Sequence, residues 1–228
     1  MRLSLPVPPF VYPIVDAAAL GGRDPGEVVR ALGRGGARLI QLRAKELRDL
    51  ALVDLASQAV AAARAVGALL VVNDRPDVAR IVGAHGVHVG QDDLPPQACR
   101  RVLGEDVLVG LSTHNLAQLE AAAGEPVDYV AVGPVFATRS KAAPDPVVGL
   151  ELLGRARRLL ARSRTHKPLV AIGGISLSNA RAVVEAGADG VAVVSALMQA
   201  EDLAAAFGEL QAALGSARFS PGPRDPLG

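Results

Sequence analysis

Amide and charged residues occur at the carboxyl-terminal ends of short apolar runs in the sequence. Gln41, Arg43 and Lys45 end one such run, and Asn73 and Asp74 end the next. Arginine offers a fork for bidentate bonds to phosphate, and lysine offers a point charge. A carboxylate beside them can ligate a hard divalent cation. These residue types indicate binding of a phosphate or pyrophosphate together with a metal ion.

The acidic residues of two neighbouring runs could share one cation. Asp74 follows the third apolar run, and Asp92 and Asp93 follow the fourth. Mg²⁺ prefers one or two carboxylates and completes its coordination with water and substrate phosphate oxygens. This sparse set of acids therefore predicts a magnesium site made by Asp74 and one of Asp92 or Asp93.

A second phosphate position is indicated near the end of the chain. Gly173 and Gly174 follow the seventh apolar run, and Val194 and Ser195 stand at the end of the eighth. Backbone amides at such strand-to-helix turns bind phosphate in many barrels. Lys141, in a long loop after the sixth run, supplies a further cation. Neither a Ser-His-Asp or Cys-His arrangement nor a P-loop lysine motif is recognisable.

Eight apolar, β-branched runs must position these residues. They span residues 11–15, 38–42, 69–72, 86–89, 108–111, 129–132, 169–172 and 190–194. The runs hardly alternate with polar residues, which is typical of parallel strands buried on both faces.

Segments with helical periodicity separate the runs. Examples are residues 50–66, 116–123, 151–161, 180–186 and 203–214. Strand and helix alternating eight times predict an α/β fold, a (β/α)₈ TIM barrel; an open doubly wound sheet is the alternative. We expect one barrel domain over residues 1–228, with its core at about 10–214 and a flexible tail over 215–228. Asp24-Pro25 and Ser178-Asn179 resemble helix N-caps.

Composition narrows the class of protein. Half of the 228 residues are hydrophobic and the formal net charge is +1, which excludes a disordered chain and argues against a nucleic-acid or membrane-surface partner. No apolar run approaches the length of a membrane span, and the N-terminus lacks the apolar segment of a signal peptide. The sequence indicates a cytoplasmic protein, for which a homo-oligomer remains an open alternative. The single cysteine, Cys99, is expected to be inert.

Taken in order, the motifs resemble the thiamine phosphate synthase (thiamine-phosphate pyrophosphorylase) family over about residues 10–210. The matching stretches are Gln41-Leu42-Arg43-Ala44-Lys45, Val72-Asn73-Asp74-Arg75, Gly86-Val87-His88-Val89-Gly90-Gln91-Asp92-Asp93-Leu94, Ser112-Thr113-His114, Gly133-Pro134-Val135-Phe136-Ala137-Thr138, Ser140-Lys141, Ala171-Ile172-Gly173-Gly174-Ile175 and Gly187-Ala188-Asp189-Gly190-Val191. Each stretch is moderately specific, and the ordered set is highly specific.

The resemblance implies a transferase of thiamine biosynthesis. Such an enzyme joins 4-amino-2-methyl-5-hydroxymethylpyrimidine diphosphate to 4-methyl-5-hydroxyethylthiazole phosphate, giving thiamine monophosphate and pyrophosphate. The implied mechanism is dissociative and Mg²⁺-assisted, with pyrophosphate leaving before the thiazole nitrogen attacks. The implied partners are therefore two small phosphorylated substrates.

The same resemblance implies roles for individual residues. The pyrimidine diphosphate would be bound by Gln41, Arg43, Lys45, Asn73, Ser112 and Lys141. Arg43, Lys45, Ser112 and Lys141 would serve catalysis, and Asp74 and Asp93 would hold Mg²⁺. The thiazole phosphate would be held by Thr138, Ser140, Gly174, Val194 and Ser195.

Other interpretations remain for some of these residues. His88, inside an apolar run, is interpreted as a packed, hydrogen-bonded residue rather than a metal ligand, and His114 as a local hydrogen-bonding residue. A related barrel could instead be a regulator or thiazole isomerase that has lost synthase activity. Another sugar-phosphate barrel, such as an epimerase or lyase, would explain the second phosphate position but not the acids and cations together.

Overall fold

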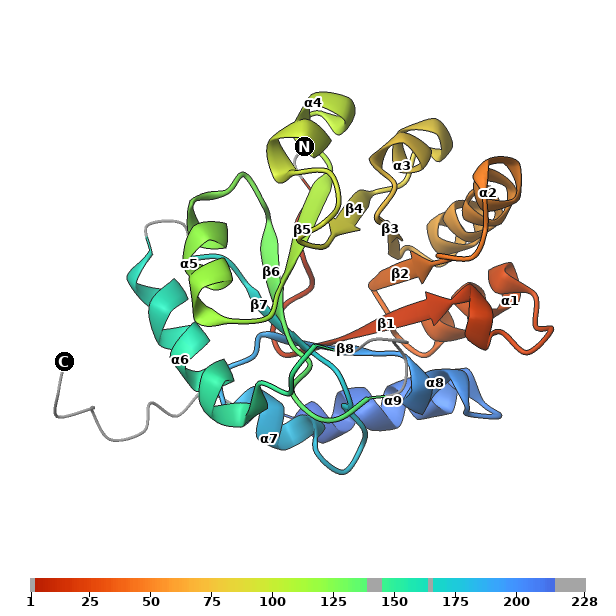
Figure 1. Ribbon diagram of the computed structural model, residues 1–228. Helices are drawn as coiled ribbons and strands as arrows, with labels where there is room; N and C mark the ends of the chain where they lie inside the picture. The colour runs from red at the N-terminus through yellow and green to blue at the C-terminus, as the bar shows by residue number, and fades with distance from the viewer. Residues whose placement is uncertain (1–2, 139–144, 164–165, 216–228) are drawn as a thin grey trace, which may run out of the picture.

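The chain folds into a closed barrel of parallel strands surrounded by helices. The structure is a computed structural model that describes residues 3–138, 145–163 and 166–215. The strands follow one another around the barrel in sequence order, and β8 returns to pair with β1 (Figure 1). The predicted (β/α)₈ barrel is confirmed and the open sheet is wrong. The predicted tail lies outside the described residues from position 216 onward.

The strands begin and end within two residues of the predicted runs. They are β1 (Phe10–Asp16), β2 (Leu39–Arg43), β3 (Leu69–Asn73), β4 (Gly86–Val89), β5 (Leu108–Thr113), β6 (Tyr129–Val132), β7 (Leu169–Ile172) and β8 (Gly190–Val193). Because most of their residues are buried on both faces, they read as continuous apolar runs.

Helices join the strands on the outside of the barrel (Figure 1). They are α1 (Pro25–Arg34), α2 (Asp49–Ala65), α3 (Pro76–Val82), α4 (Pro96–Leu103), α5 (Leu116–Gly124), α6 (Gly149–Arg162), α7 (Ala180–Glu185), α8 (Ser195–Met198) and α9 (Leu203–Leu214), with a 3₁₀ turn at Ala17–Ala19. Asp24 caps α1 as predicted, because its carboxylate accepts from the amide of Glu27 at 2.8 Å. Asn179 stands at the predicted N-cap position of α7, but its side chain makes no cap bond and instead bonds the preceding loop at Gly174 and Ser176.

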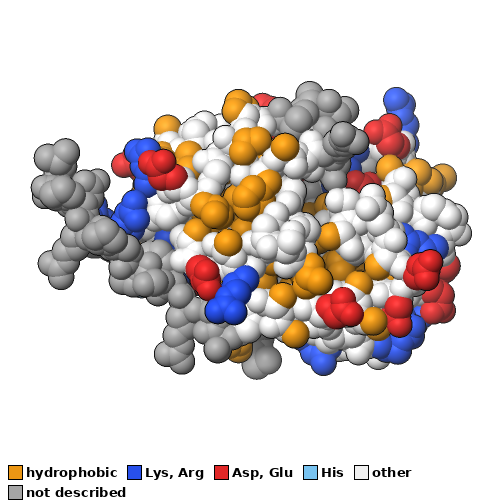
Figure 2. All heavy atoms as spheres, turned by 90° about the horizontal axis from the view of Figure 1, so that it is seen from below, with side chains coloured by type: hydrophobic (Ala, Val, Ile, Leu, Met, Phe, Trp, Pro, Cys, Tyr) orange, Lys and Arg blue, Asp and Glu red, His pale blue; other side chains and the backbone are white. Residues whose placement is uncertain are grey.

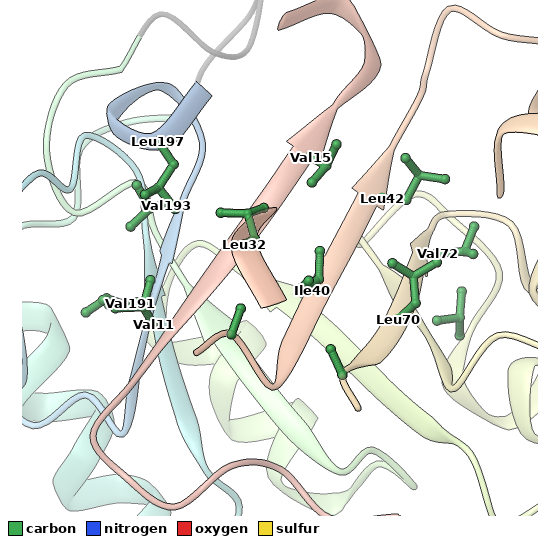
Figure 3. Close-up of a cluster of buried hydrophobic side chains, with 14 of the residues drawn as sticks. Val11, Val15, Leu32, Ile40, Leu42, Leu70, Val72, Val191, Val193 and Leu197 are labelled. Atoms are coloured by element: carbon green, nitrogen blue, oxygen red, sulfur yellow. The ribbon is translucent and has the colours of Figure 1, made fainter. Parts of the chain in front are cut away.

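Two hydrophobic layers hold the barrel together. Outward side chains of the strands pack against the helices, and Figure 3 shows part of this layer, with Leu32 of α1 among side chains of β1 and β2. A smaller cluster fills the barrel interior, and it includes Phe10, Tyr12, Leu39, Leu108 and Tyr129. The interior is therefore a packed core. Its side chains nearest the carboxyl ends of the strands form the floor of a site located there.

Ion pairs secure the amino ends of the strands. Asp189, just before β8, accepts two bonds of 2.9 Å from the Arg157 guanidinium and one of 2.8 Å from the amide of Leu169 in β7. Asp128, before β6, likewise accepts from Arg100 and, at 2.7 Å, from the amide of Val109. These carboxylates fix the register of neighbouring strands at the end of the barrel that usually serves stability.

The outer surface carries charges of both signs. On the face seen in Figure 2, hydrophobic side chains gather near the centre, and acidic and basic side chains are interspersed around them. Within the described residues, no helix is long and apolar enough to cross a membrane.

Candidate active site

A cavity of about 400 Å³ opens at the carboxyl ends of the strands. It brings together every predicted site residue that the structure describes. These are Gln41, Arg43, Lys45, Asn73, Asp74, Asp93, Ser112, Thr138, Gly174, Val194 and Ser195. The two remaining predicted residues, Ser140 and Lys141, lie outside the described residues.

A buried carboxylate holds the arginine of the site. The Arg43 guanidinium forms an ion pair with Asp16, whose side chain is only 8 % exposed. The other oxygen of Asp16 accepts from the amide of Ala18 at 3.1 Å. Sequence analysis missed Asp16, although it stands directly behind the first apolar run. The pair keeps the guanidinium at the cavity, where a phosphate could reach it.

Lys45 and Asp74 form a second ion pair at the rim. The Lys45 Nζ lies 3.0 Å from Oδ2 of Asp74. Asp74 adopts a left-handed backbone conformation, with φ of 63°, while its amide donates to the carbonyl of His88 at 2.8 Å. A non-glycine residue in this conformation is uncommon and often marks a functional turn. The turn links the end of β3 to β4 and fixes the carboxylate beside the cavity.

Asp93 lies beside Asp74 at the same rim. One Asp93 oxygen accepts from the amide of Gly90 at 2.7 Å. Burial, and next the neighbouring Asp74 carboxyl, raise the pKa of Asp93 above its ordinary value. Asp92 also lines the cavity but is exposed. Two adjacent carboxyl groups at a cavity rim suit a divalent cation. Among the described residues no cluster of three or more His, Cys, Asp or Glu side chains could hold a metal.

Aromatic and polar side chains form the floor of the cavity. Gln41 donates to the hydroxyl of Tyr12 at 3.1 Å, and this hydroxyl lies 3.0 Å from that of Tyr129. His88 Nδ1 lies 3.0 Å from the Tyr129 hydroxyl, and its Nε2 lies 2.8 Å from Oγ of Ser112. His88 is thus the packed, hydrogen-bonded residue that the sequence indicates. The tyrosines were missed, although a buried tyrosine in an apolar run needs a partner for its hydroxyl.

The opposite side of the cavity is formed by the loops after β6 and β7. Gly174 has φ of +64°, and a Cβ on it would lie 2.5 Å from the carbonyl oxygen of Ala137 and 2.7 Å from Cβ of Phe136. Asn179 donates to the carbonyl of Gly174 at 3.0 Å and accepts from the amide of Ser176 at 2.8 Å. The glycine is therefore required for the close approach of these two loops.

His114 links the loops after β5 and β6. Its Nδ1 lies 2.7 Å from the carbonyl oxygen of Gly133 and 3.5 Å from a carboxylate oxygen of Asp145. Its backbone amide donates to Gln118 at 2.7 Å. These contacts agree with the local hydrogen-bonding role that the sequence indicates for His114.

Comparison with known proteins gives consistent results. A family profile described as thiamine monophosphate synthase matches residues 11–197. The thiamine-phosphate synthase of Koribacter versatilis is 46 % identical over 195 residues, which cover 83 % of this chain and 89 % of that protein. The enzyme of the same name from Anaeromyxobacter dehalogenans is 44 % identical over 203 residues, 89 % of each chain.

A solved structure resembles the barrel closely. The thiamine phosphate pyrophosphorylase of Pyrococcus furiosus superposes with a TM-score of 0.78 and 34 % sequence identity. The match covers 90 % of this chain and 95 % of that one. The similarity thus extends over the whole barrel.

Proposed function

The chain belongs to the thiamine-phosphate synthase family, and we propose that it joins an aminopyrimidine methyl diphosphate to a thiazole phosphate. The members of this family are enzymes of thiamine biosynthesis. The proposed substrates are 4-amino-2-methyl-5-hydroxymethylpyrimidine diphosphate and 4-methyl-5-hydroxyethylthiazole phosphate. The proposed products are thiamine monophosphate and pyrophosphate.

One observation carries the proposal. A single cavity has cations and paired carboxylates at one side and a glycine-serine rim at the other. Arg43, Lys45 and the Asp74–Asp93 pair suit a diphosphate with its metal, and Gly174 and Ser195 suit a second phosphate. A site for one phosphorylated sugar would not need both sides.

The first step breaks the bond between the methylene carbon and the bridging oxygen. The electron pair leaves with the pyrophosphate, and the electron-rich aminopyrimidine stabilises the methylene cation that remains. Arg43 and Lys45 act here by stabilising the negative charge that develops on the leaving group. Lys141, outside the described residues, is proposed to assist them. Because Arg43 is already held by Asp16, little reorganisation is needed at this moment.

The second step forms the carbon–nitrogen bond. The lone pair of the thiazole nitrogen attacks the cation, so no external base or oxidant is required. Thr138, Gly174, Val194 and Ser195, with Ser140 outside the described residues, are proposed to hold the thiazole phosphate in line. Orientation of this kind suits a reaction in which the second substrate supplies the nucleophile.

Asp74 and Asp93 are the residues that would hold Mg²⁺. Burial, and after it the neighbouring Asp74 carboxyl, raise the pKa of Asp93, and a divalent cation between the two carboxylates would offset their repulsion. When bound, Mg²⁺ would supply Lewis-acid stabilisation of the departing diphosphate. Lys45 beside Asp74 would then be available for the phosphate oxygens.

Incubation of the purified chain with both substrates tests the proposal. We expect thiamine monophosphate and pyrophosphate in equal amounts, detected by chromatography and ³¹P NMR. Omission of either substrate should abolish both products. Conversion of a thiazole compound alone would indicate an isomerase, and no turnover of any of these compounds would contradict the proposed function.

A further inference from the structure

We propose that Tyr129 and His88 act as positioning residues, which set the hydrogen-bonding polarity of Gln41 and Ser112 at the cavity floor. One chain of hydrogen bonds, here called the floor chain, crosses the barrel interior. It runs in order through Gln41, Tyr12, Tyr129, His88 and Ser112. The inference rests on the proposed function for the identity of its ligand, but not for its geometry.

The floor chain is built from five strands, and its central residue is enclosed. Four of its members line the cavity, whereas Tyr129 does not reach it and is fully buried. The rings support one another: Tyr12 meets Tyr129 edge-on at 79°, and His88 stacks on Tyr129 with ring centres 5.5 Å apart. Tyr129 therefore acts on the cavity only through its neighbours.

A glycine in β5 makes room for the centre of the floor chain. A Cβ on Gly110 would lie 2.4 Å from the Tyr129 hydroxyl and 2.5 Å from Nδ1 of His88. Real Cβ atoms essentially never approach other atoms so closely. Any larger residue at position 110 would displace the link between Tyr129 and His88. The sequence of β5 is thus compatible with this link only because glycine stands there.

Counting hydrogens gives the floor chain one direction. The Gln41 amide donates to Tyr12, so Tyr12 can donate its only hydrogen to Tyr129. Continued in this direction, the count assigns Tyr129 as the donor to Nδ1 of His88 at 3.0 Å and Nε2 of His88 as the donor to Ser112 at 2.8 Å, two contacts whose direction depends on the tautomer of His88. In the reverse direction Tyr12 would accept two hydrogens, and its own would have no acceptor in the floor chain. A buried donor without an acceptor is costly, which favours the first direction.

The imidazole must be neutral for this arrangement, with a single N–H. Both ring nitrogens of His88 contact uncharged hydroxyl groups, Tyr129 at Nδ1 and Ser112 at Nε2, and the side chain is buried, which favours the neutral ring. Burial also raises the pKa of Tyr12 and Tyr129, so both hydroxyls keep their hydrogens.

The direction determines what the two ends offer to a ligand. Gln41 keeps its carbonyl oxygen as an acceptor, and Ser112 keeps its hydroxyl hydrogen as a donor. A flat heteroaromatic ring with an exocyclic amino group and a nearby acceptor atom matches this pair. A ring without the amino group would leave the Gln41 carbonyl oxygen without a donor. The site should therefore discriminate against such a ring more strongly than a pocket that recognises shape alone.

The tautomer of His88 can be measured in the unaltered chain. We expect ¹⁵N NMR of ¹⁵N-histidine-labelled protein at pH 7 to show His88 protonated at Nε2 and unprotonated at Nδ1. The chain has 4 histidines, and the His88 signals are those lost in His88→Gln. A ring protonated at Nδ1, or at both nitrogens, would overturn the proposal whether or not the chain is a synthase.

Tyr129→Phe tests the effect on the ligand. It removes one hydroxyl from the centre of the floor chain, and the KM for the pyrimidine diphosphate should rise about tenfold, with less than about a twofold change for the thiazole phosphate. The Nδ1 resonance of His88 should shift as well. Thr113→Val is the matched control, because Thr113 is fully buried in β5 and its hydroxyl donates to the carbonyl of Ala131 at 2.9 Å.

The control should lose stability without a selective change in KM. Equal effects of Tyr129→Phe and Thr113→Val on the two KM values would overturn the positioning role. If Tyr129→Phe does not fold, the tautomer of the unaltered chain still decides the proposal. Failure of the unaltered chain to make thiamine monophosphate would contradict the proposed function and leave the tautomer result to stand by itself.

Discussion

Asp93 and Asp92 are neighbours in sequence with different surroundings. Asp93 is half-buried, accepts from the Gly90 amide and lies beside Asp74, whereas Asp92 is exposed at the same cavity. Asp93→Asn should therefore lower kcat/KM by about 100-fold or more and weaken the dependence on Mg²⁺, because it removes a proposed metal ligand. Asp92→Asn should lower it less than about threefold. Steady-state kinetics at several Mg²⁺ concentrations provide the measurement.

The fold should survive in both variants. An asparagine at position 93 can still accept from the Gly90 amide, and it removes a charge that Asp74 disfavours. Thermal unfolding should therefore show no loss of stability for Asp93→Asn. Equal kinetic losses in the two variants would mean that Asp93 has no special role at the metal.

For single residues, the sequence predicts where a side chain lies better than it predicts which side chains it contacts. Polar residues behind apolar runs were found because strand ends of a barrel meet at one face. Their partners were not: Asp16 holds Arg43, and Tyr129 lies inside a run that reads as ordinary core. Such contacts join strands far apart in sequence, and no local pattern encodes them.

The loop after β7 depends on the backbone of Gly174. Gly174 and Gly67 both have φ near +65°, but nothing lies within 4 Å of a Cβ built on Gly67. Gly67→Ala should therefore cost only backbone strain, about 1 kcal/mol. Gly174→Ala should cost about 2 kcal/mol more, because its methyl group would collide with the Phe136–Ala137 segment. Chemical denaturation of both variants measures the difference.

The same variants separate strain from function. Displacement of the loop after β6 should raise the KM for the thiazole phosphate in Gly174→Ala and leave it unchanged in Gly67→Ala. Similar stability and similar KM in the two variants would show that the loops after β6 and β7 can separate freely. The phosphate site would then not depend on their close approach.

The amino ends of the strands should affect stability without affecting catalysis. Asp189 joins α6, β7 and β8 through Arg157 and the amide of Leu169. Asp189→Asn should lose about 2 kcal/mol, or roughly 4–8 °C in melting temperature for a chain of this size. Both KM values should stay unchanged at 25 °C. A changed KM without a change in melting temperature would contradict this prediction, because Asp189 would then affect substrate binding rather than stability.

Elements were the most predictable level of the structure. All eight strands lie where β-branched runs predict them, since burial on both faces leaves no polar alternation to confuse the pattern. Helix ends were less predictable. Asn179 looks like a cap, yet the Gly173–Gly174 turn uses its side chain for two loop bonds, a tertiary requirement that overrides the local signal.

Acid should destabilise the whole molecule through His88. Burial lowers the pKa of His88 to about 4, whereas an unfolded histidine titrates near about 6.5. Between these values the unfolded chain binds a proton that the folded chain does not. The stability present above pH about 6.5 is therefore lost as the pH falls toward about 4, by up to about 1.4 kcal/mol per pH unit.

Urea unfolding between pH 7.5 and 5 measures this loss. His85, whose pKa is also lowered by burial, acts in the same direction, and the raised pKa of Asp93 acts in the opposite one. His88→Gln isolates the contribution of His88 and should reduce the proton uptake on unfolding by about one below pH 6. If the free energy of unfolding of His88→Gln changes with pH as steeply as that of the unaltered chain, His88 is protonated in the folded barrel.

The central claim is that one cavity forms thiamine monophosphate from two phosphorylated substrates with the help of a divalent cation. Its most direct test is the initial rate of product formation by the unaltered chain, with both substrates, in Mg²⁺ and after a strong chelator. We expect rapid formation with Mg²⁺, loss of at least about 100-fold in the chelator, and recovery when Mg²⁺ is restored. Turnover that is unaffected by the chelator, or no thiamine monophosphate under either condition, would contradict the claim.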